Sequence, residues 1–565
     1  MPHALRFGVV LAAALAVAAP TAHAGHPEPA ATTALAGSAD SAAMADLEAK
    51  ITDALQVGHV VPVDFDSPAQ LPGHVIRAPY WGDTQLWSGV YVGGESMRYA
   101  VAKAHLGELA GQHDNSRATR DAIAGWTAQR DEALQRVRTI LDAQHRDVSI
   151  AEDWVGTPNL PPRVNTSDPR GPHTLDYGGG VVHGERGLVT RGCTPKGLGP
   201  MGISPPNHDP NNPVNDSSNH VYEITWTHGD GVTYYCETSP SRDTYAGLTF
   251  GMLTAFDLVT GDEPRLRAQV RDDLLAMAHY LVAHGWNHVR PNGAVGTNND
   301  EDGFVSPLME HVPLARLNIV NAARHVADTA GTAADKQTWD AIWAEELASQ
   351  GPLVAANMQV DAAQPSSSYF KFNLNHLLGF NLLRTTVGSE RDLFARGFAV
   401  MDKTTRDDVN AHFEALTFGL TGEPSRRDAA VTHLEQWLDY RAAVTGGGPV
   451  HNSARCGADL ECVPVDRSEL LIDQAPSGSV AWYPETAPFS DPSHLRAAAP
   501  LPVVQRPPAD FLWQAPPTAL DGQQDASHRE PGIDFLTPYW TVRYFTEVAA
   551  PALSPFPDWA GPASR

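Results

Sequence analysis

Two kinds of helical segment alternate along most of this 565-residue chain. The first kind is apolar on all sides and contains glycine, as in TYAGLTFGMLTAFDLVT (244–260). The second kind carries charge on one face, as in EPRLRAQVRDDLLAMAHYLVAHG (263–285). A helix that is apolar all round has to be buried, whereas a helix with a single apolar stripe covers other helices from outside. The alternation therefore predicts pairs of one inner and one outer helix.

Six segments of each kind can be assigned. We expect the inner helices at 84–106, 244–260, 313–331, 368–386, 407–422 and 532–550. We expect the outer helices at 41–56, 116–144, 263–285, 333–350, 389–405 and 425–444, with Ser116 as a possible N-cap of the second. The last inner helix has no outer partner after it unless the chain closes on itself. We therefore predict an all-α fold, an (α/α)6 toroid over residues 41–550, with an open α-solenoid as the alternative.

The two ends of the chain are expected to lie outside this fold. Residues 1–24 combine Arg6, a short apolar run and an Ala22-His23-Ala24 site, which together predict a cleaved signal peptide and a secreted or periplasmic protein. Residues 25–40 have the composition of a disordered leader, and 551–565 form a tail. No later segment is long and apolar enough to predict a membrane span.

Two insertions interrupt the helical pattern, at 153–240 and 445–530. The first contains strand-like patches at 221–229 and 231–238 around Gly229-Asp230-Gly231, which predicts a small β-hairpin. The chain has four cysteines, and an exported protein with an even number favours disulfides. Of the three possible pairings, we expect the sequence-local one, with the alternative of free thiols. It joins Cys193 to Cys236 and Cys456 to Cys462.

The net charge of −26 argues against nucleic acid or an anionic membrane as the partner. The chain contains no glycine-rich phosphate loop, no H-E-x-x-H and no G-x-S-x-G elbow ahead of a helix. We therefore expect no cofactor, and we expect a monomer.

In a double ring the inner helices run in the same direction, so residues at their starts converge on one cleft. Polar and aromatic residues recur at these starts. They are Asp83, Trp87, Arg242, Asp243, Tyr245, Glu310, His311, Asn373, Asn375, His376, His412, Glu414, Tyr539 and Trp540. Carboxylates, imidazoles and flat rings in one groove suit sugars, whose apolar faces stack on aromatic rings and whose hydroxyl groups need polar partners. This pattern predicts a carbohydrate substrate.

The stretches W-G-D-T-Q-L-W-S-G (81–89) and S-R-D-T-Y-A-G (241–247) at helix starts resemble those of (α/α)6 carbohydrate-active enzymes. These include unsaturated glucuronyl hydrolases, other toroid glycosidases and toroid polysaccharide lyases. The resemblance extends in pattern over residues 80–550, but it matches no single family throughout. It implies a carboxylate acid and base in a hydrolase. In a lyase it implies a Tyr or His base with an Asn, Arg or His that neutralises the substrate carboxylate.

We predict a glycoside hydrolase with Asp243 and Asp83 as the acid/base pair. The alternative interpretation of each aspartate is a helix N-cap. Arg242 could bind a substrate carboxylate or form a plain ion pair. A polysaccharide lyase is the runner-up, with His376, His412, Tyr245 or Tyr539 as base and Asn373, Asn375 or Arg242 beside the substrate carboxylate. Glu310, His311, Glu414 and the rings of Trp87, Tyr539 and Trp540 would contact the sugar.

A toroid that binds glycans without cleaving them is an alternative of another class. One further stretch, TNNDEDGFVSP (297–307), is dense in oxygen ligands. A solvated acidic loop is the expected interpretation, and a structural Ca²⁺ near Asn299, Asp300 and Asp302 is the alternative.

Overall fold

The computed structural model describes residues 47–48, 58–65, 75–78, 81–112, 114, 116–154, 164–165, 173–174, 184–204, 221–238, 240–286, 288–289, 295–296, 312–358, 369–445, 461–466, 490–507, 509, 511–520, 528–529 and 532–553. The predicted signal peptide and leader lie outside these residues. So does the outer helix expected at 41–56, apart from Leu47 and Glu48, which are helical. Of the tail, only residues 551–553 are described.

The described part of the chain is mostly helical, with eleven α-helices, and this confirms the predicted all-α class. The apolar set consists of α3 (Thr84–Gly111), α5 (Arg242–Leu258), α7 (Pro313–Ala330), α10 (Phe370–Thr385), α12 (Ala411–Thr421) and α14 (Ile533–Glu547). The charged set consists of α4 (Arg117–Ser149), α6 (Pro264–Ala283), α8 (Ala333–Met358), α11 (Gly388–Thr405) and α13 (Pro424–Thr445). Ser116 caps α4 as expected, because its hydroxyl accepts a hydrogen bond from the backbone N–H of Thr119.

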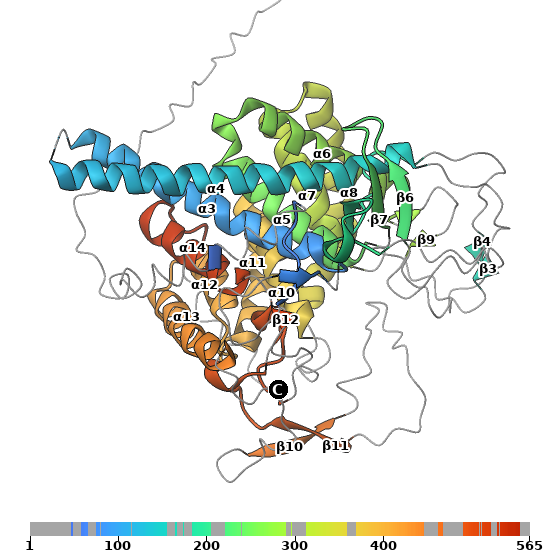
Figure 1. Ribbon diagram of the computed structural model, residues 1–565. Helices are drawn as coiled ribbons and strands as arrows, with labels where there is room; N and C mark the ends of the chain where they lie inside the picture. Colours follow the sequence, from blue (N-terminus) through green and yellow to red (C-terminus); the bar gives the residue numbers. More distant parts are fainter. Residues whose placement is uncertain are drawn as a thin grey trace, which may run out of the picture.

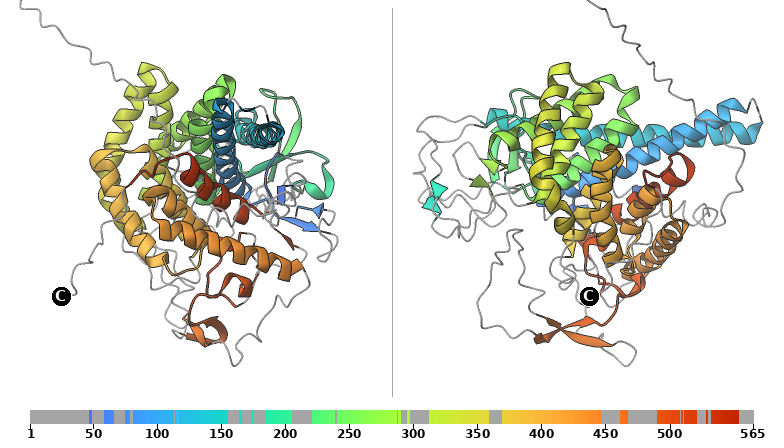
Figure 2. Two further views of the ribbon diagram at one scale, coloured as in Figure 1. Left: turned by 90° about the vertical axis from the view of Figure 1, so that its left-hand side faces the viewer. Right: turned by 180° about the vertical axis from the view of Figure 1, so that it is seen from behind.

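The apolar helices contact one another in chain order. α3 packs on α5, α5 on α7, α7 on α10, α10 on α12, and α12 on α14. The last of these, α14, packs against the first, α3, and the two lie side by side in Figures 1 and 2. Each charged helix contacts the apolar helix that precedes it. The hydrophobic core is therefore shared between helices from the beginning and the end of the chain.

The backbones of α3 and α5 approach each other closely in this core. A Cβ atom added to Gly89 would lie 1.9 Å from the carbonyl oxygen of Gly247. A Cβ atom on Gly251 would lie 2.5 Å from the carbonyl oxygen of Gly89. Only glycine allows two backbones to come this close. The glycines of the W-S-G and Y-A-G stretches therefore bring the two helices into backbone contact.

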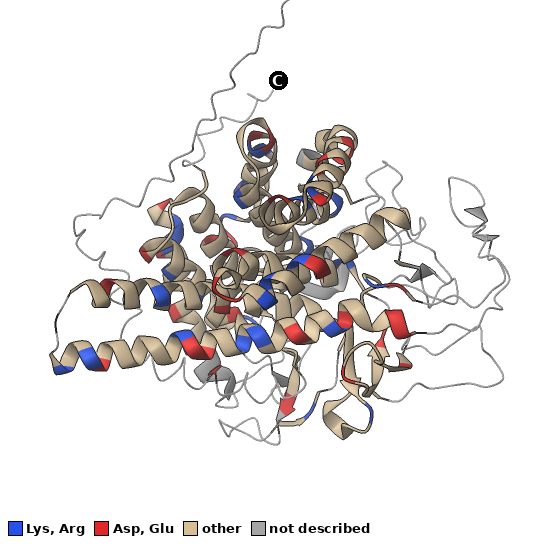
Figure 3. Cartoon of the chain, turned by 90° about the horizontal axis from the view of Figure 1, so that it is seen from above, with Lys and Arg blue, Asp and Glu red and all other residues tan. Residues whose placement is uncertain are grey.

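The two longest helices, α3 and α4, extend together beyond the rest of the molecule (Figure 1). Acidic and basic residues are interspersed along them (Figure 3). At the base of this pair, Arg98 of α3 donates hydrogen bonds to Glu48 and Glu132 at 3.0 Å and 2.6 Å. Glu48 also accepts one from Tyr91 at 2.9 Å. Arg136 of α4 lies 3.2 Å from the Glu48 carboxylate, so the short helical stretch at 47–48 is tied to both helices.

Small antiparallel sheets accompany the helices. β5 (Gly192–Pro195), β6 (Val221–Thr225) and β7 (Thr233–Glu237) form one in the order β5-β7-β6. The predicted hairpin at 221–238 is confirmed as β6 and β7. The structure also has a three-stranded sheet in the order β12-β1-β2, formed by β12 (His528–Arg529), β1 (Val63–Phe65) and β2 (Val75–Arg77). Three further sheets have two strands each. They pair β10 (Cys462–Asp466) with β11 (Ser490–Ala497), β3 (Val164–Asn165) with β4 (His173–Thr174), and β8 (His288–Val289) with β9 (Val295–Gly296).

The predicted Cys193–Cys236 disulfide is confirmed, and its two cysteines face each other across β5 and β7. Cys462 is also disulfide-bonded. Cys456, its predicted partner, lies outside the described residues. None of the helices in the described ranges is long and apolar enough to cross a membrane.

Candidate active site

The starts of α3 and α5 bring together the two aspartates that the sequence analysis singled out. Asp83 directly precedes α3, and Asp243 is the second residue of α5. The glycine contacts described above hold the two helices together near these ends. Asp83 lies close enough to Asp243 for its negative charge to raise the pKa of the Asp243 carboxyl group. Two acids 160 residues apart in sequence therefore share one location.

Neither aspartate caps its helix through its side chain. Asp83 stands at the N-cap position of α3, but its carboxylate makes no capping hydrogen bond. The N-cap of α5 is Ser241, which forms a capping box with Thr244. The N-cap interpretation of Asp243 is therefore wrong, because Ser241 already accepts the hydrogen bond that a cap would receive. Asp243 instead accepts a hydrogen bond from its own backbone N–H, whereas Ser241 takes the N-cap role.

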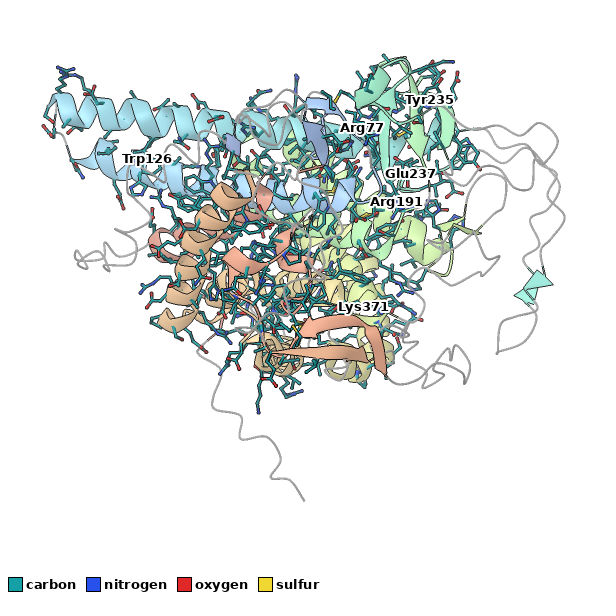
Figure 4. The ribbon with its side chains drawn as sticks, turned by 60° about the horizontal axis from the view of Figure 1, so that its bottom comes forward. Arg77, Trp126, Arg191, Tyr235, Glu237 and Lys371 are labelled. Atoms are coloured by element: carbon teal, nitrogen blue, oxygen red, sulfur yellow. A yellow bond between two sulfur atoms is a disulfide. The ribbon has the colours of Figure 1, made fainter. Side chains whose placement is uncertain are left out.

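The β5–β7 sheet adds two charged residues that the sequence analysis missed. Arg191 directly precedes β5, and its guanidinium Nη1 lies 3.1 Å from the Glu237 carboxylate at the end of β7. Its Nη2 lies 3.9 Å from the Asp83 carboxylate. Figure 4 shows Arg191 and Glu237 close together where the sheet meets the helices. Arg191 therefore connects an acid on the sheet with an acid at the start of α3.

Burial and charge act together on the acids of this cluster. The pKa of Asp243 is raised to about 7, first by burial and then by the charge of Asp83, while Arg191 and Arg242 oppose the rise. Burial also raises the pKa of Glu237, which Arg191 counteracts. Asp83 keeps 23% of its side chain exposed. The cluster thus combines a carboxyl group whose pKa is raised with a second, partly exposed acid, and acid and base work needs two such groups.

Arg242, expected as a substrate contact, is the first residue of α5 and is half-buried. Its positive charge acts on Asp243 beside it. Of the predicted residues, Asp83, Asp243 and Arg242 are therefore brought together by the structure.

The two candidate histidines are buried elsewhere in the core. His376 lies nearly two turns into α10, and His412 is the second residue of α12. His376 stacks on Phe413, with ring centres 3.9 Å apart, and its Nδ1 hydrogen-bonds with the carbonyl oxygen of Phe372 at 2.8 Å. His412 packs edge-on against Phe511, with ring centres 5.3 Å apart. Burial lowers the pKa of His376 to about 4 and that of His412 to about 3, so both rings are neutral near pH 7. Neither side chain has measurable solvent exposure.

A short segment around Phe511 covers these helix starts. Phe511 stacks on Trp87 of α3, with ring centres 4.8 Å apart, while it also contacts His412. Trp513 accepts a hydrogen bond from Asn410 at its carbonyl oxygen, at 2.8 Å. The structure thus buries Trp87, where the sequence analysis predicted a stacking platform for a sugar. The second insertion supplies the aromatic ring that occupies this platform.

The other predicted contacts are also buried. Glu414 accepts hydrogen bonds from Arg426 at 2.8 Å and 2.9 Å. Tyr245 and Asn373 are buried, and the polar atoms of their side chains make no hydrogen bond among the described residues. Asn375, Tyr539 and Trp540 are buried as well. These residues contribute to the core in this structure and do not join the cluster around Asp243.

Two predicted features cannot be placed. Glu310 and His311, and the possible Ca²⁺ ligands Asn299, Asp300 and Asp302, lie outside the described residues. Among the residues that are described, no group of three or more His, Cys, Asp or Glu side chains could hold a metal ion.

Comparison with protein-family models, with curated proteins and with solved structures finds no significant match for this chain.

Proposed function

We propose that this protein is an exported glycoside hydrolase whose acid/base pair is Asp243 and Asp83. The observation that carries the proposal is that two acids 160 residues apart, Asp83 and Asp243, meet at the adjoining starts of α3 and α5. Burial and the charge of Asp83 raise the pKa of Asp243 there. Glycoside cleavage by this route needs one carboxyl group that donates a proton to the leaving oxygen and one carboxylate that acts on the opposite side of the bond. Asp243 would be the proton donor, and Asp83 would be the ionised partner.

We also propose that the helices form an (α/α)6 toroid with this pair at the N-terminal ends of its inner helices. The cyclic order of contacts, from α3 through α5, α7, α10, α12 and α14 back to α3, supports this architecture. The alternation of apolar and charged helices supports the division into inner and outer rings. Export agrees with the Cys193–Cys236 disulfide, since disulfides persist in oxidising compartments.

The lyase alternative has less support from the arrangement of its candidate residues. All of its proposed bases are buried within the core, namely His376, His412, Tyr245 and Tyr539. A base that abstracts a proton from a sugar has to come within hydrogen-bond distance of that proton. The acids at Asp243 and Asp83 are more accessible, and this favours hydrolysis.

The proposal is tested with purified full-length protein on a panel of neutral and uronate-containing glycans. Reducing ends and ultraviolet absorbance are followed together, because elimination leaves a conjugated double bond and hydrolysis of an ordinary glycan does not. We expect new reducing ends without absorbance. We expect Asp243→Asn and Asp83→Asn to lower the rate on the order of 100-fold or more with the fold unchanged.

The control is Asp121→Asn, which changes an acid on the exposed face of α4. The side chain of Asp121 is 72% exposed. It should leave the rate unchanged. Absorbing products would replace the hydrolase with the lyase. Glycan binding without cleavage, unaffected by either Asp83→Asn or Asp243→Asn, would replace it with a non-catalytic binding protein.

A further inference from the structure

Arg191 belongs to the first insertion, yet its side chain reaches the carboxylate pair on the helices. Its guanidinium lies 3.1 Å from the Glu237 carboxylate and 3.9 Å from the Asp83 carboxylate. An arginine presents several N–H donors in a rigid plane, so one side chain can engage two carboxylates at once. Both partners are acids of the cluster around Asp243. The side chain is only 13% exposed, so its charge acts in a partly desolvated place.

The backbone around Arg191 is held on both sides. Its N–H donates to the carbonyl oxygen of Glu237 at 2.8 Å. Two residues further on, Cys193 is bonded to Cys236, the neighbour of Glu237. The disulfide therefore locks the register of the two strands that carry the Arg191–Glu237 pair.

Gly192 connects this locked register to the entry of α3. A Cβ atom added to Gly192 would lie 3.1 Å from the ring of Trp81 and 3.6 Å from the side chain of Thr84. The chain after Arg191 is thus packed directly against the residues on either side of Asp83. With the strand pairing on one side and this contact on the other, the position of the guanidinium relative to Asp83 is set by the fold.

We propose that Arg191 is a positioning residue for the Asp83–Asp243 pair, held in place by Glu237 and by the Cys193–Cys236 disulfide. In this role Arg191 orients the Asp83 carboxylate and makes it easier for Asp243 to release its proton. The catalytic part of this inference rests on the proposed function. Arg191 itself need not touch the substrate.

The charges that act on Asp243 come from three elements. They are Asp83 before α3, Arg191 before β5, and Arg242 in α5 itself. Asp83 favours the protonated form of Asp243, whereas the two arginines favour the ionised form. Removing the positive charge of Arg191 should therefore let Asp243 keep its proton to higher pH. In the proposed enzyme, the alkaline limb of the pH–rate profile would move in the same direction.

The test follows the titration of Asp243 by NMR in the full-length protein with ¹³C-labelled aspartate carboxyl groups, assigned with the Asp243→Asn variant. In Arg191→Gln we expect the midpoint of Asp243 to rise by about one pH unit. In Arg191→Lys, which keeps the charge but loses the planar fork, we expect a smaller rise. Thermal unfolding checks that each variant is folded.

The matched control is Lys196→Gln. Lys196 follows β5 in the same sheet and pairs with Glu223 at 2.8 Å, and both side chains are about half exposed. This variant should leave the Asp243 midpoint unchanged. An unshifted midpoint in folded Arg191→Gln, or in Arg191→Lys if the glutamine variant does not fold, would overturn the inference.

This measurement needs no substrate, so it separates the two proposals. A shifted midpoint in a protein that cleaves no glycan would refute the proposed function and leave the effect of Arg191 on Asp243 standing. Glycan cleavage that depends on Asp243, together with an unshifted midpoint, would support the proposed function and refute the role of Arg191.

Discussion

The starts of α3 and α5 and the N-terminal halves of α10 and α12 all carry titratable residues, but the two regions differ in structure. At the first pair, Asp83 and Asp243 share a partly exposed location with Arg191. At the second pair, His376 and His412 are enclosed by Phe413 and Phe511. Polar residues at a helix start can therefore face an accessible site or fill the core. The side chains that pack on each residue decide which of the two occurs.

The comparison also shows that a perturbed pKa does not by itself identify a site. Burial raises the pKa of Glu414 to about 7, as it does for Asp243. Glu414 is only 4% exposed, and Arg426 binds both Glu414 and Asp402. That acid is enclosed in an ion-pair network that joins α11, α12 and α13. Asp243 differs because its strongest acidic neighbour, Asp83, is accessible.

The largest expected effect tests whether the Glu414 network is structural. Arg426→Met would leave two buried carboxylates without their shared partner, which costs about 3–5 kcal/mol of unfolding free energy. Chemical denaturation at pH 7 measures this loss. The control is Arg427→Met, the next residue, whose partner Asp428 is exposed, and it should cost at most about 1 kcal/mol. Equal losses in the two variants would contradict a special role for the buried network.

An intermediate effect tests whether glycine packing creates the Asp83–Asp243 pair. Gly89→Ala would place a methyl group against the backbone of Gly247, so α3 and α5 would have to separate at a cost of about 1–3 kcal/mol. The pKa of Asp243 should then fall, because Asp83 moves away. In the same helix, Gly107 has nothing within 4 Å of an added Cβ atom. Gly107→Ala should instead stabilise by about 0.5–1 kcal/mol. An unchanged Asp243 titration in Gly89→Ala would count against this origin of the pair.

The smallest expected effect is a difference in the pH dependence of stability between the Asp83–Asp243 region and the region of His376 and His412. The folded pKa of Asp243, about 7, lies above the unfolded value of about 3.9. The contribution of Asp243 to the free energy of unfolding is therefore present below pH 4 and is lost as pH rises through 7. The folded pKa values of His376 and His412, about 4 and about 3, lie below the unfolded value of about 6.5. Their contribution is present above pH 6.5 and is lost as pH falls.

Thermal unfolding between pH 4 and 8 checks these opposite signs. Asp243→Asn should gain stability relative to the parent protein as pH rises. His412→Gln should gain relative stability as pH falls. Parallel curves for either variant and the parent protein would show that the corresponding group does not change its pKa on folding.

Much of the secondary structure was predictable, because it depends on local patterns. The helix predicted at 313–331 is observed at Pro313–Ala330, and the one predicted at 425–444 at Pro424–Thr445. The hairpin was predictable from its glycine turn. The Cys193–Cys236 disulfide was predictable because these two cysteines are neighbours in the order of cysteines along the chain. Arg191 and Glu237 were missed because nothing in a Gly- and Pro-rich insertion indicates which side chains will meet a helix start. Their positions beside the two cysteines were the one available signal.

By itself, the sequence determined which segments are helical, which of them are apolar all round, and that Asp83 and Asp243 stand at helix starts. These properties follow from hydrophobic periodicity and from short-range backbone chemistry. Only the tertiary structure decided that these two acids meet, that Arg191 joins them, and that Trp87 and His412 are covered by Phe511. Periodicity states which face of a helix is buried, but contacts between residues hundreds of positions apart depend on how whole helices and insertions pack.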